Sequence, residues 1–334
     1  MRFAFVTLSL AVLALAPAGR SQSAQSAQRT VEPARFAGQN CVRLAEWAKA
    51  NGFEVRWLKQ DETLQLSNRW SKIVLAADSR EAQINGVQVW LLYPVVAQNG
   101  ALCLARLDVE ATIRPFVSPP RNQPGAKVRT ICLDPGHGGK DPGNEIGSNQ
   151  EKQYTLLLAK EVRAQLAQEG LKVTLTRSTD SFVELSKRPQ LAKRRGADLF
   201  ISLHFNAAES GRSTVQGAEV YCLTPAGATS TNARGEGNGE RAFPGNRHND
   251  QNLFLAYQVQ KALTRNLTVE DRGVRRARFA VLRDAVMPAA LIEAGFLSHP
   301  MEGRQIVSVA YRQKIARAIV EGLLAYKRAV EQGT

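Results

Sequence analysis

The stretch ICLDPGHGGKDPG, Ile131 to Gly143, decides how this chain folds and where its chemistry lies. It begins as an apolar strand and then places one histidine, His137, among four glycines and two prolines. Glycine lets a loop turn tightly and leaves room for a ligand beside its neighbours. We therefore predict that a buried strand ends here and that the loop carrying His137 lines a site.

Apolar segments and long helical patterns alternate on the C-terminal side of residue 127. Strands are predicted in VRTICL, LKVTLT, DLFISL, AEVYCL and AALIEA, and helices in EKQYTLLLAKEVRAQLAQEG and NDQNLFLAYQVQKALTRNL. This alternation predicts an α/β domain with a largely parallel sheet covered by helices on both faces. Sites in such sheets form at the carboxyl ends of the strands.

Four polar residues fall at or near these strand ends although they are far apart in the sequence. His137 follows TICLDPG, His204 follows DLFISL, Glu293 ends AALIE, and Glu151 opens the first long helix. Two imidazoles and one carboxylate can hold a zinc ion with a fourth position open, and the remaining carboxylate can act as a base. From the residues alone, Glu151 could instead be a helix-start carboxylate and GHGG a phosphate-binding loop.

These blocks closely resemble the zinc-dependent N-acetylmuramoyl-L-alanine amidases of type 3, the AmiA/AmiB/AmiC-like group. The similarity covers about two hundred residues from Val128 onwards and includes LDPGHGGKDPGN, EKQYTLLLAKEV, GADLFISLHFNAA and VMPAALIEAGFLSHP in the family order. The resemblance implies that His137, Glu151 and His204 bind one Zn²⁺ and that Glu293 is the catalytic acid and base. It implies cleavage of the amide bond between N-acetylmuramic acid and L-alanine in peptidoglycan.

Two other functions use the same residues. A different zinc peptidase acting on peptidoglycan peptides would need the same metal ligands, and a non-catalytic envelope regulator could be built on the same fold. The complete set of four polar residues argues against the regulator. Asp134 and Asn206 lie near the two histidines in sequence and are candidates to orient an imidazole, although Asp134 could equally cap the turn.

The N-terminal half predicts a separate small module. Residues 31–115 contain one helical segment followed by short alternating strands with an Asn85-Gly86 turn, which indicates an α+β fold. This pattern resembles the N-terminal domain of copper amine oxidases, implies no copper site, and suggests a binding or spacing role. The proline-rich residues 116–127 are predicted to be a linker, and residues 128–331 the zinc amidase catalytic domain.

Residues 1–27 have the pattern of a secretory signal peptide followed by a polar spacer. A basic residue precedes the apolar run FAFVTLSLAVLALA, and small residues follow it. A transmembrane anchor is the alternative, but the run is short for a bilayer, so we predict no stable membrane insertion. The protein is expected to be exported, and to be periplasmic or associated with the cell wall.

Export bears on the four cysteines. In an oxidising compartment the simplest pairing joins Cys41 to Cys103 and Cys132 to Cys222, each within one part of the chain. Buried free thiols are the alternative. Cys132, beside the glycine-rich loop, could also be proposed as a nucleophile, but its place in an apolar strand favours packing or a disulfide.

The composition favours an anionic partner outside the cell. The chain has 44 basic and 30 acidic residues, a formal net charge of +14, which suits wall polymer. No nucleic-acid-binding motif is present, so nucleic acid is not expected. Basic segments such as SKRPQLAKRR are most simply interpreted as solvated helix faces. We expect a monomer that acts on peptidoglycan. The sequence leaves open whether an activator protein is needed.

Overall fold

A computed structural model describes residues 41–98, 100–231, 239 and 241–332. These residues belong to one of the two structural units of the chain, residues 40–334. The predicted signal peptide and spacer, residues 1–27, lie outside the described residues. In the described part of the chain, no helix combines the length and apolar character that crossing a membrane requires.

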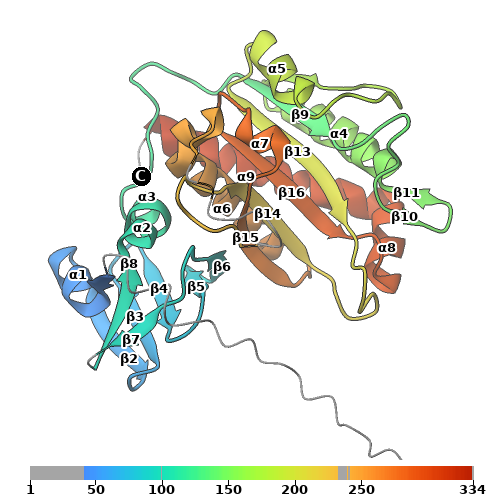
Figure 1. Ribbon diagram of the computed structural model, residues 1–334. Helices are drawn as coiled ribbons and strands as arrows, with labels where there is room; N and C mark the ends of the chain where they lie inside the picture. The colour runs from blue at the N-terminus through green and yellow to red at the C-terminus, as the bar shows by residue number, and fades with distance from the viewer. Residues whose placement is uncertain (1–40, 99, 232–238, 240, 333–334) are drawn as a thin grey trace, which may run out of the picture. The chain divides into compact units, whose positions relative to one another are not determined.

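A mostly parallel sheet carries the predicted strand ends of the C-terminal part (Figure 1). Its strands run in the order β12 (Lys172–Leu175), β9 (Thr130–Pro135), β13 (Leu199–Asn206), β16 (Ala289–Phe296), β14 (Ala218–Leu223) and β15 (Asp271–Ala277). Neighbouring strands pair in parallel, except that β14 is antiparallel to β16. The predicted α/β fold with a largely parallel sheet is therefore confirmed.

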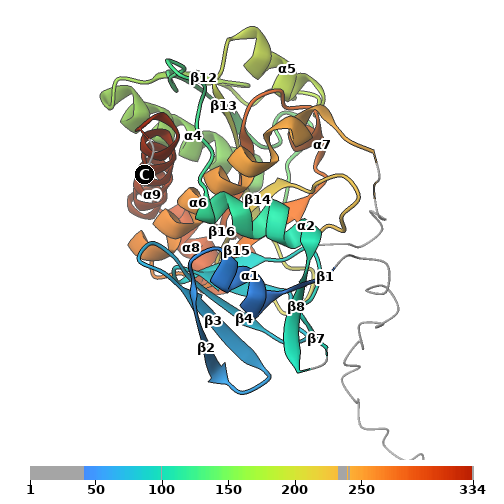
Figure 2. The ribbon, with the colours of Figure 1, turned by 90° about the vertical axis from the view of Figure 1, so that its left-hand side faces the viewer.

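The two faces of this sheet are covered by different helices. Side chains at alternate positions belong to separate clusters: Ile201 and Leu203 of β13 pack in the large core, whereas Phe200 packs in a smaller one. The large core is covered by α4 (Glu151–Gln168), α6 (Asn249–Asn266) and α9 (Val309–Gln332), which lie side by side in Figure 2. The smaller core is covered by α5 (Lys187–Arg194) and α7 (Ala280–Arg283).

The remaining elements of the C-terminal part are short and flank the sheet. They are the hairpin strands β10 (Glu145–Ile146) and β11 (Asn149–Gln150), the 3₁₀ helix η3 (Pro244–His248) and the helix α8 (Pro300–Val307). The hairpin leads directly into α4, so it fixes where the first residue of that helix lies. The loop after β9 and the start of α4 are thereby brought to the same edge of the sheet.

The N-terminal part is an α+β module, as predicted. Its elements are β1 (Cys41–Arg43), α1 (Leu44–Ala50), β2 (Glu54–Lys59), β3 (Thr63–Ser67), β4 (Lys72–Ala76), β5 (Glu81–Ile84), β6 (Val87–Trp90), β7 (Val96–Gln98), β8 (Ala101–Ala105), α2 (Arg106–Asp108), the π-helical turn η2 (Val109–Ile113) and α3 (Arg114–Val117). The predicted Asn85-Gly86 turn joins β5 to β6, and both residues have positive φ, 50° and 81°.

The antiparallel strands β2 to β6 continue the large sheet through one parallel bridge between Val89 of β6 and Val274 of β15. Arg276 of β15 is fully buried and donates from Nη2 to the carbonyl oxygen of Ala111 at 2.7 Å. The helix α3 includes the first two residues of the predicted linker, and residues 118–129 form no helix or strand. The exact domain boundaries stay a prediction.

The predicted pairing of Cys132 with Cys222 is wrong. Cys132 lies on β9 and packs in the smaller core, whereas Cys222 lies on β14 and packs in the large core. The strands β13 and β16 separate them, so the two thiols are on opposite faces of the sheet and too far apart for a disulfide. Burial raises the pKa of Cys132 to about 11, which also argues against a nucleophile.

The cysteines of the N-terminal module lie on neighbouring strands. Arg43 of β1 pairs with Cys103 of β8, so Cys41 and Cys103 project from the same face of the two strands. Burial, followed by the contact with the Cys103 side chain, raises the pKa of Cys41 to about 12. Both residues are free thiols in this structure, so their pairing stays a prediction.

We expect Cys132 and Cys222 to remain free in the folded protein. Denaturing it in iodoacetamide without a reductant should alkylate both residues completely, because each is buried on its own face and meets no other cysteine. Peptide mass spectrometry measures this directly. Recovery of a peptide in which these two cysteines are joined would contradict the observed topology.

Candidate metal centre

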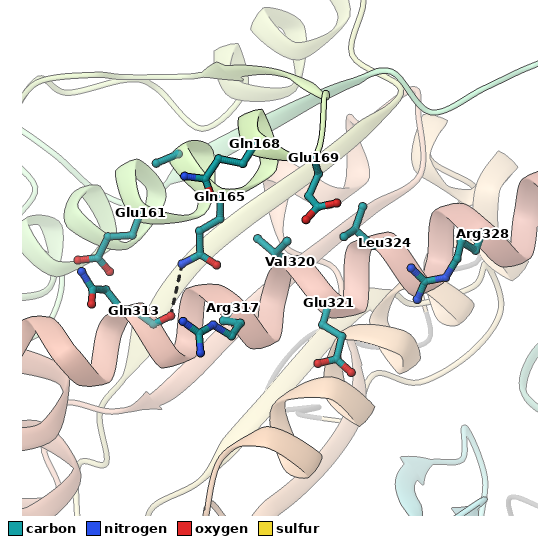
Figure 3. Close-up of a pocket in the computed structure, with 11 residues that line it drawn as sticks. Glu161, Gln165, Gln168, Glu169, Gln313, Arg317, Val320, Glu321, Leu324 and Arg328 are labelled. Atoms are coloured by element: carbon teal, nitrogen blue, oxygen red, sulfur yellow. Dashed lines mark hydrogen bonds between the residues drawn. The ribbon is translucent and has the colours of Figure 1, made fainter.

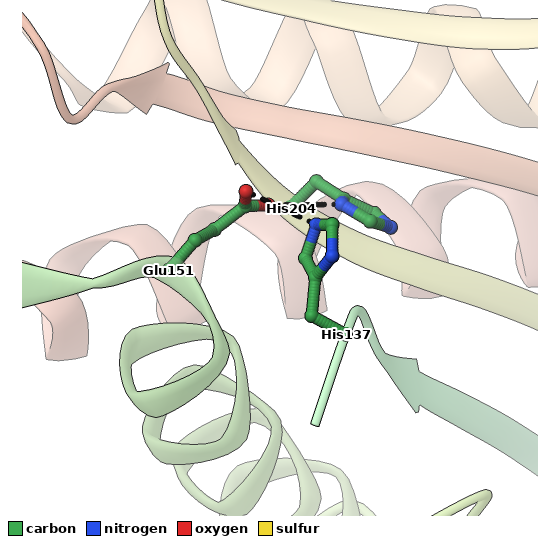
Figure 4. A group of neighbouring side chains, drawn as sticks. All are labelled: His137, Glu151 and His204. Atoms are coloured by element: carbon green, nitrogen blue, oxygen red, sulfur yellow. Dashed lines mark hydrogen bonds and ion pairs between the residues drawn. The ribbon is translucent and has the colours of Figure 1, made fainter. Parts of the chain in front are cut away.

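Three predicted ligands come together at the carboxyl edge of the sheet. His137 lies in the turn after β9, His204 lies near the end of β13, and Glu151 is the first residue of α4 (Figure 4). Each offers one ligand atom, and these atoms all lie within 4.8 Å of one another. Residues separated by up to 67 positions in the chain therefore form one cluster.

The Glu151 carboxylate is the centre of this cluster. Its Oε2 atom lies 3.1 Å from Nε2 of His137, and its Oε1 atom lies 2.9 Å from Nδ1 of His204. The backbone N–H of Phe205 donates to Oε1 at 3.1 Å, and Asn144 donates to Oε2 from both its backbone and its side chain. The carboxylate is thus held on both oxygens with its face towards the two imidazoles.

Electrostatics keep this carboxylate ionised although it is buried. Burial by itself would raise the pKa of Glu151, but hydrogen bonds and attraction from His137 and His204 outweigh it and lower the pKa far below the ordinary value. A buried anion facing two imidazoles is a suitable place for a cation. Glu151 is therefore more than a helix-start carboxylate.

The second nitrogen of His137 is hydrogen-bonded to Asp141. Its Nδ1 lies 2.9 Å from Oδ2 of Asp141, which leaves Nε2 facing Glu151. Burial lowers the pKa of His137, but contacts with Glu151 and then Asp141 outweigh this and raise it above 6.5. A carboxylate on the far nitrogen orients a ligating imidazole. The sequence signal for Asp141 was its place four residues after His137 in the same loop.

The two residues that the sequence suggested as imidazole partners do something else. Asp134 is fully buried and accepts hydrogen bonds from Thr176 and Ser202, and it contacts no histidine. Asn206 donates from its side chain to Glu219 at 2.8 Å. Proximity in sequence misled here because other partners engage both side chains: Thr176, Ser202 and Arg188 bind Asp134, and Glu219 binds Asn206.

Glu293 lies beside the cluster on the neighbouring strand β16. It pairs in register with His204 across β13 and with Glu219 across β14. Its Oε2 atom is buried and has no hydrogen-bond partner among the described residues. Burial, followed by repulsion from Glu151 and Glu219, raises the pKa of Glu293 well above 4.5. An unpaired buried carboxyl next to a cation site is chemically available for proton transfer.

Two arginines form ion pairs with the carboxylate of Glu219. Its Oε2 accepts from Nε of Arg272 at 3.1 Å and forms an ion pair with Arg275, whose Nε lies 2.9 Å away. Tyr221 also donates its hydroxyl to Oε1 of Glu219 at 2.8 Å. Sequence reasoning did not identify this group, because Glu219 reaches Glu293 only through the pairing of β14 with β16.

A pocket of about 390 Å³ opens over these residues. Its lining includes His137, Glu151, His204 and Glu293 together with the apolar side chains of Leu185, Phe279, Ala280, Val281 and Leu291. The pocket can therefore take a ligand that has both polar and apolar groups. A second groove lies between α4 and α9, is lined by residues such as Gln165 and Arg317, and contains none of the cluster residues (Figure 3).

The donor set suits zinc. Two imidazole nitrogens and one carboxylate oxygen are the protein ligands found in catalytic zinc sites, which keep a fourth position for water or substrate. His137 and His204 each turn one ring nitrogen towards the buried Glu151 carboxylate, so all three ligand atoms face a common point. The Asp141 contact supplies the supporting hydrogen bond that such sites have.

Residues 131–325 match the sequence profile of the N-acetylmuramoyl-L-alanine amidase family, which is more than half of the chain. The chain belongs to this family. Residues 23–114 match the profile of the copper amine oxidase N-terminal domain, so both resemblances inferred from the sequence are confirmed.

Individual members of the amidase family agree with this assignment. The N-acetylmuramoyl-L-alanine amidase AmiA of Escherichia coli is 34% identical over 233 residues, covering 63% of this chain and 80% of the relative. LytC of Bacillus subtilis is 35% identical over 199 residues, covering 60% of this chain and 36% of the relative. The structure of AmiC2 of Nostoc punctiforme superposes with a TM-score of 0.50 at 34% identity, covering 60% and 98% of the two chains.

In this amidase-family protein, Gly136 must be glycine because His204 lies against it. A methyl group at this position would stand 2.2 Å from Cε1 and 2.5 Å from Nε2 of His204. We expect Gly136→Ala to displace the imidazole and to weaken metal binding. Overpacking should also lower the free energy of unfolding by about 1–3 kcal/mol. Isothermal titration of the metal-free protein with Zn²⁺ measures the loss of zinc affinity.

Gly170→Ala is the matched control for that substitution. Gly170 has a φ of +76° and nothing within 4 Å of an added methyl group, so alanine there brings backbone strain without crowding the cluster. Its zinc affinity should equal that of the wild type. Equal zinc affinity of Gly136→Ala and the wild type would show that zinc binding does not depend on the present position of the His204 imidazole.

Proposed function

We propose that this protein is a zinc-dependent peptidoglycan amidase in which His137, Glu151 and His204 hold the metal and Glu293 transfers the proton. The bond cleaved is the amide between the lactyl group of N-acetylmuramic acid and L-alanine. The observation that carries the proposal is the convergence of the three ligand atoms within 4.8 Å beside an unpaired buried carboxyl. Zinc, when bound, would acidify a water molecule and polarise the scissile carbonyl.

Glu293 has the properties of the proton carrier. Its pKa is raised by burial and by the neighbouring carboxylates, so it is a stronger base than an ordinary glutamate. We infer that the Glu293 carboxylate accepts a proton from the attacking water. It then delivers that proton to the nitrogen of L-alanine as the carbon–nitrogen bond breaks, which leaves a carboxylate on the lactyl group and a free amine on the peptide.

The protein's own residues also orient the substrate. Leu185, Phe279 and Val281 line the same pocket as the metal cluster and can contact the methyl groups of the lactyl and alanyl units. The polar lining residues hold the amide at the catalytic carboxyl. Export and a monomeric state are part of the proposal, with peptidoglycan as the partner; the need for an activator protein is left open.

Digestion of purified peptidoglycan tests the function. The protein without residues 1–27 is incubated with and without added zinc, and the released fragments are identified by mass spectrometry. Zinc-dependent release of stem peptides with a free L-alanine amine supports the amidase. Cleavage inside the stem peptide would identify a different zinc peptidase, and zinc binding without any release from several peptidoglycan types would favour a binding protein.

A further inference from the structure

Arg188 is buried where the sequence pattern predicted a solvated basic face. It belongs to α5, its side chain is 1% exposed, and it is among the largest fully buried side chains of the described residues. The neighbouring Lys187, Lys193 and Arg194 on the same short helix are exposed. A guanidinium out of water is costly unless each of its donors is satisfied. The burial of Arg188 therefore needs a physical explanation, whereas the exposed basic residues of the same helix do not.

All three nitrogens of the Arg188 guanidinium donate hydrogen bonds, and two of them donate to the strand end and the loop that carry His137. Its Nη2 donates to the carbonyl oxygen of His137 at 2.9 Å, and its Nη1 donates to the carbonyl oxygen of Pro135 at 2.9 Å. Its Nε donates to the carbonyl oxygen of Val183 at 3.0 Å. One side chain thus binds two carbonyls of the metal-binding loop and ties them to the segment before α5.

Asp134 balances the charge of Arg188. Its Oδ1 accepts from Nη1 of Arg188 at 2.9 Å and from Thr176 at 2.6 Å, and its Oδ2 accepts from Ser202 at 2.8 Å. Both members of this ion pair are 1% exposed. A buried pair of this kind tolerates desolvation only when its other hydrogen bonds are made, and here they are.

The contact with His137 matters because of that residue's backbone. His137 has a φ of +61°, in the left-handed region that costs a residue with a Cβ atom of the order of 1 kcal/mol or more. Such a conformation persists only where surrounding contacts impose it. The Nη2 contact holds the His137 carbonyl, and thereby the peptide plane from which the imidazole projects towards Glu151.

We propose that Arg188, charge-balanced by Asp134, is the positioning residue for the ligand His137 and sets the affinity of the site for zinc. This inference rests on the proposed function only in taking zinc as the ion. Lysine cannot replace Arg188, because one ammonium group cannot bind Asp134, the Pro135 carbonyl and the His137 carbonyl in the same geometry. The role is to hold a ligand, and Arg188 itself touches no reacting atom.

The first test compares Arg188→Lys with Arg194→Lys, an exposed arginine on the same helix. Zinc affinity is measured by competition with a chromophoric chelator, and the thermal unfolding of the metal-free proteins is followed by circular dichroism. Arg188→Lys should bind zinc about 10–100-fold more weakly, and Arg194→Lys as tightly as the wild type. Wild-type affinity in a folded Arg188→Lys protein would overturn the proposal, even if its metal-free form melts earlier.

A second variant covers the case in which Arg188→Lys does not fold. The double variant Asp134→Asn/Arg188→Gln removes both charges together, so it leaves no buried charge unpaired. Its zinc affinity should fall by the same factor relative to Asp134→Asn, in which the guanidinium and its carbonyl contacts remain. Equal affinities of these two variants would sink the proposal.

These binding measurements are independent of amide hydrolysis. If the wild type binds zinc tightly and releases nothing from peptidoglycan, amide hydrolysis by the protein alone is excluded, while the role of Arg188 is still decided by the affinities. If hydrolysis is observed and Arg188→Lys binds zinc as the wild type does, the positioning role fails while the amidase proposal stands.

Discussion

Glu293→Gln should abolish peptidoglycan hydrolysis while leaving zinc binding intact. An amide cannot accept and return the proton, and loss of a general acid and base costs about 10²–10⁴ in rate. The substitution keeps the size of a side chain whose Oε2 atom has no hydrogen-bond partner among the described residues. Release of stem peptides from purified peptidoglycan, set against the zinc content of the same preparation, measures the effect.

The stability of this variant provides an internal check. Burial and repulsion from Glu151 and Glu219 act against the charged form of Glu293, so a neutral side chain should unfold at the same or a higher denaturant concentration than the wild type. Glu209→Gln, which removes an exposed carboxylate, serves as the control for activity. Hydrolysis by Glu293→Gln within a few-fold of the wild type would assign the proton transfer to another group.

Glu151→Gln should remove zinc and activity together. The Glu151 carboxylate contacts both imidazoles, at 3.1 and 2.9 Å, and is the negative charge of the cluster. Because losing a supporting residue of a metal site costs about 10–100-fold in affinity, losing the ligand should cost at least about 100-fold. Equilibrium dialysis against buffered zinc gives the affinity, and peptidoglycan digestion gives the activity.

Glu145→Gln is the matched control for this second substitution. Glu145 lies on β10 in the same loop region, and its side chain is exposed. Its zinc affinity and activity should equal those of the wild type. Wild-type zinc affinity in Glu151→Gln would mean that the ion binds elsewhere or without the carboxylate, and the proposed ligand set would then be wrong.

Much of the fold and the candidate site follows from the sequence because buried parallel strands have a distinctive pattern. All six residues of β9 are buried, and its apolar residues Ile131, Cys132 and Leu133 come directly before Asp134 and the glycine-rich loop. The polar residues after such segments mark the carboxyl edge of the sheet. His137 and His204 were found in this way, whereas the ligand role of Glu151, at the start of a helix, came from the family resemblance; the structure brings the three ligand atoms within 4.8 Å.

Only the tertiary structure decided which charged side chains support the site. Asp141 rather than Asp134 contacts His137, Glu219 meets Glu293 through the β14–β16 register, and Arg188 is buried in a helix that looks solvated in sequence. Cys132 and Cys222 face opposite cores although both lie in apolar strands.

The physical reason is the range of the interactions. The alternation of apolar residues and the glycines of a tight loop are local, so a sequence determines them by itself. The burial of a charge depends on partners that the fold supplies: Arg188 is buried because Asp134 and the carbonyl oxygens of Pro135 and His137, more than fifty residues earlier in the chain, lie within reach of its donors.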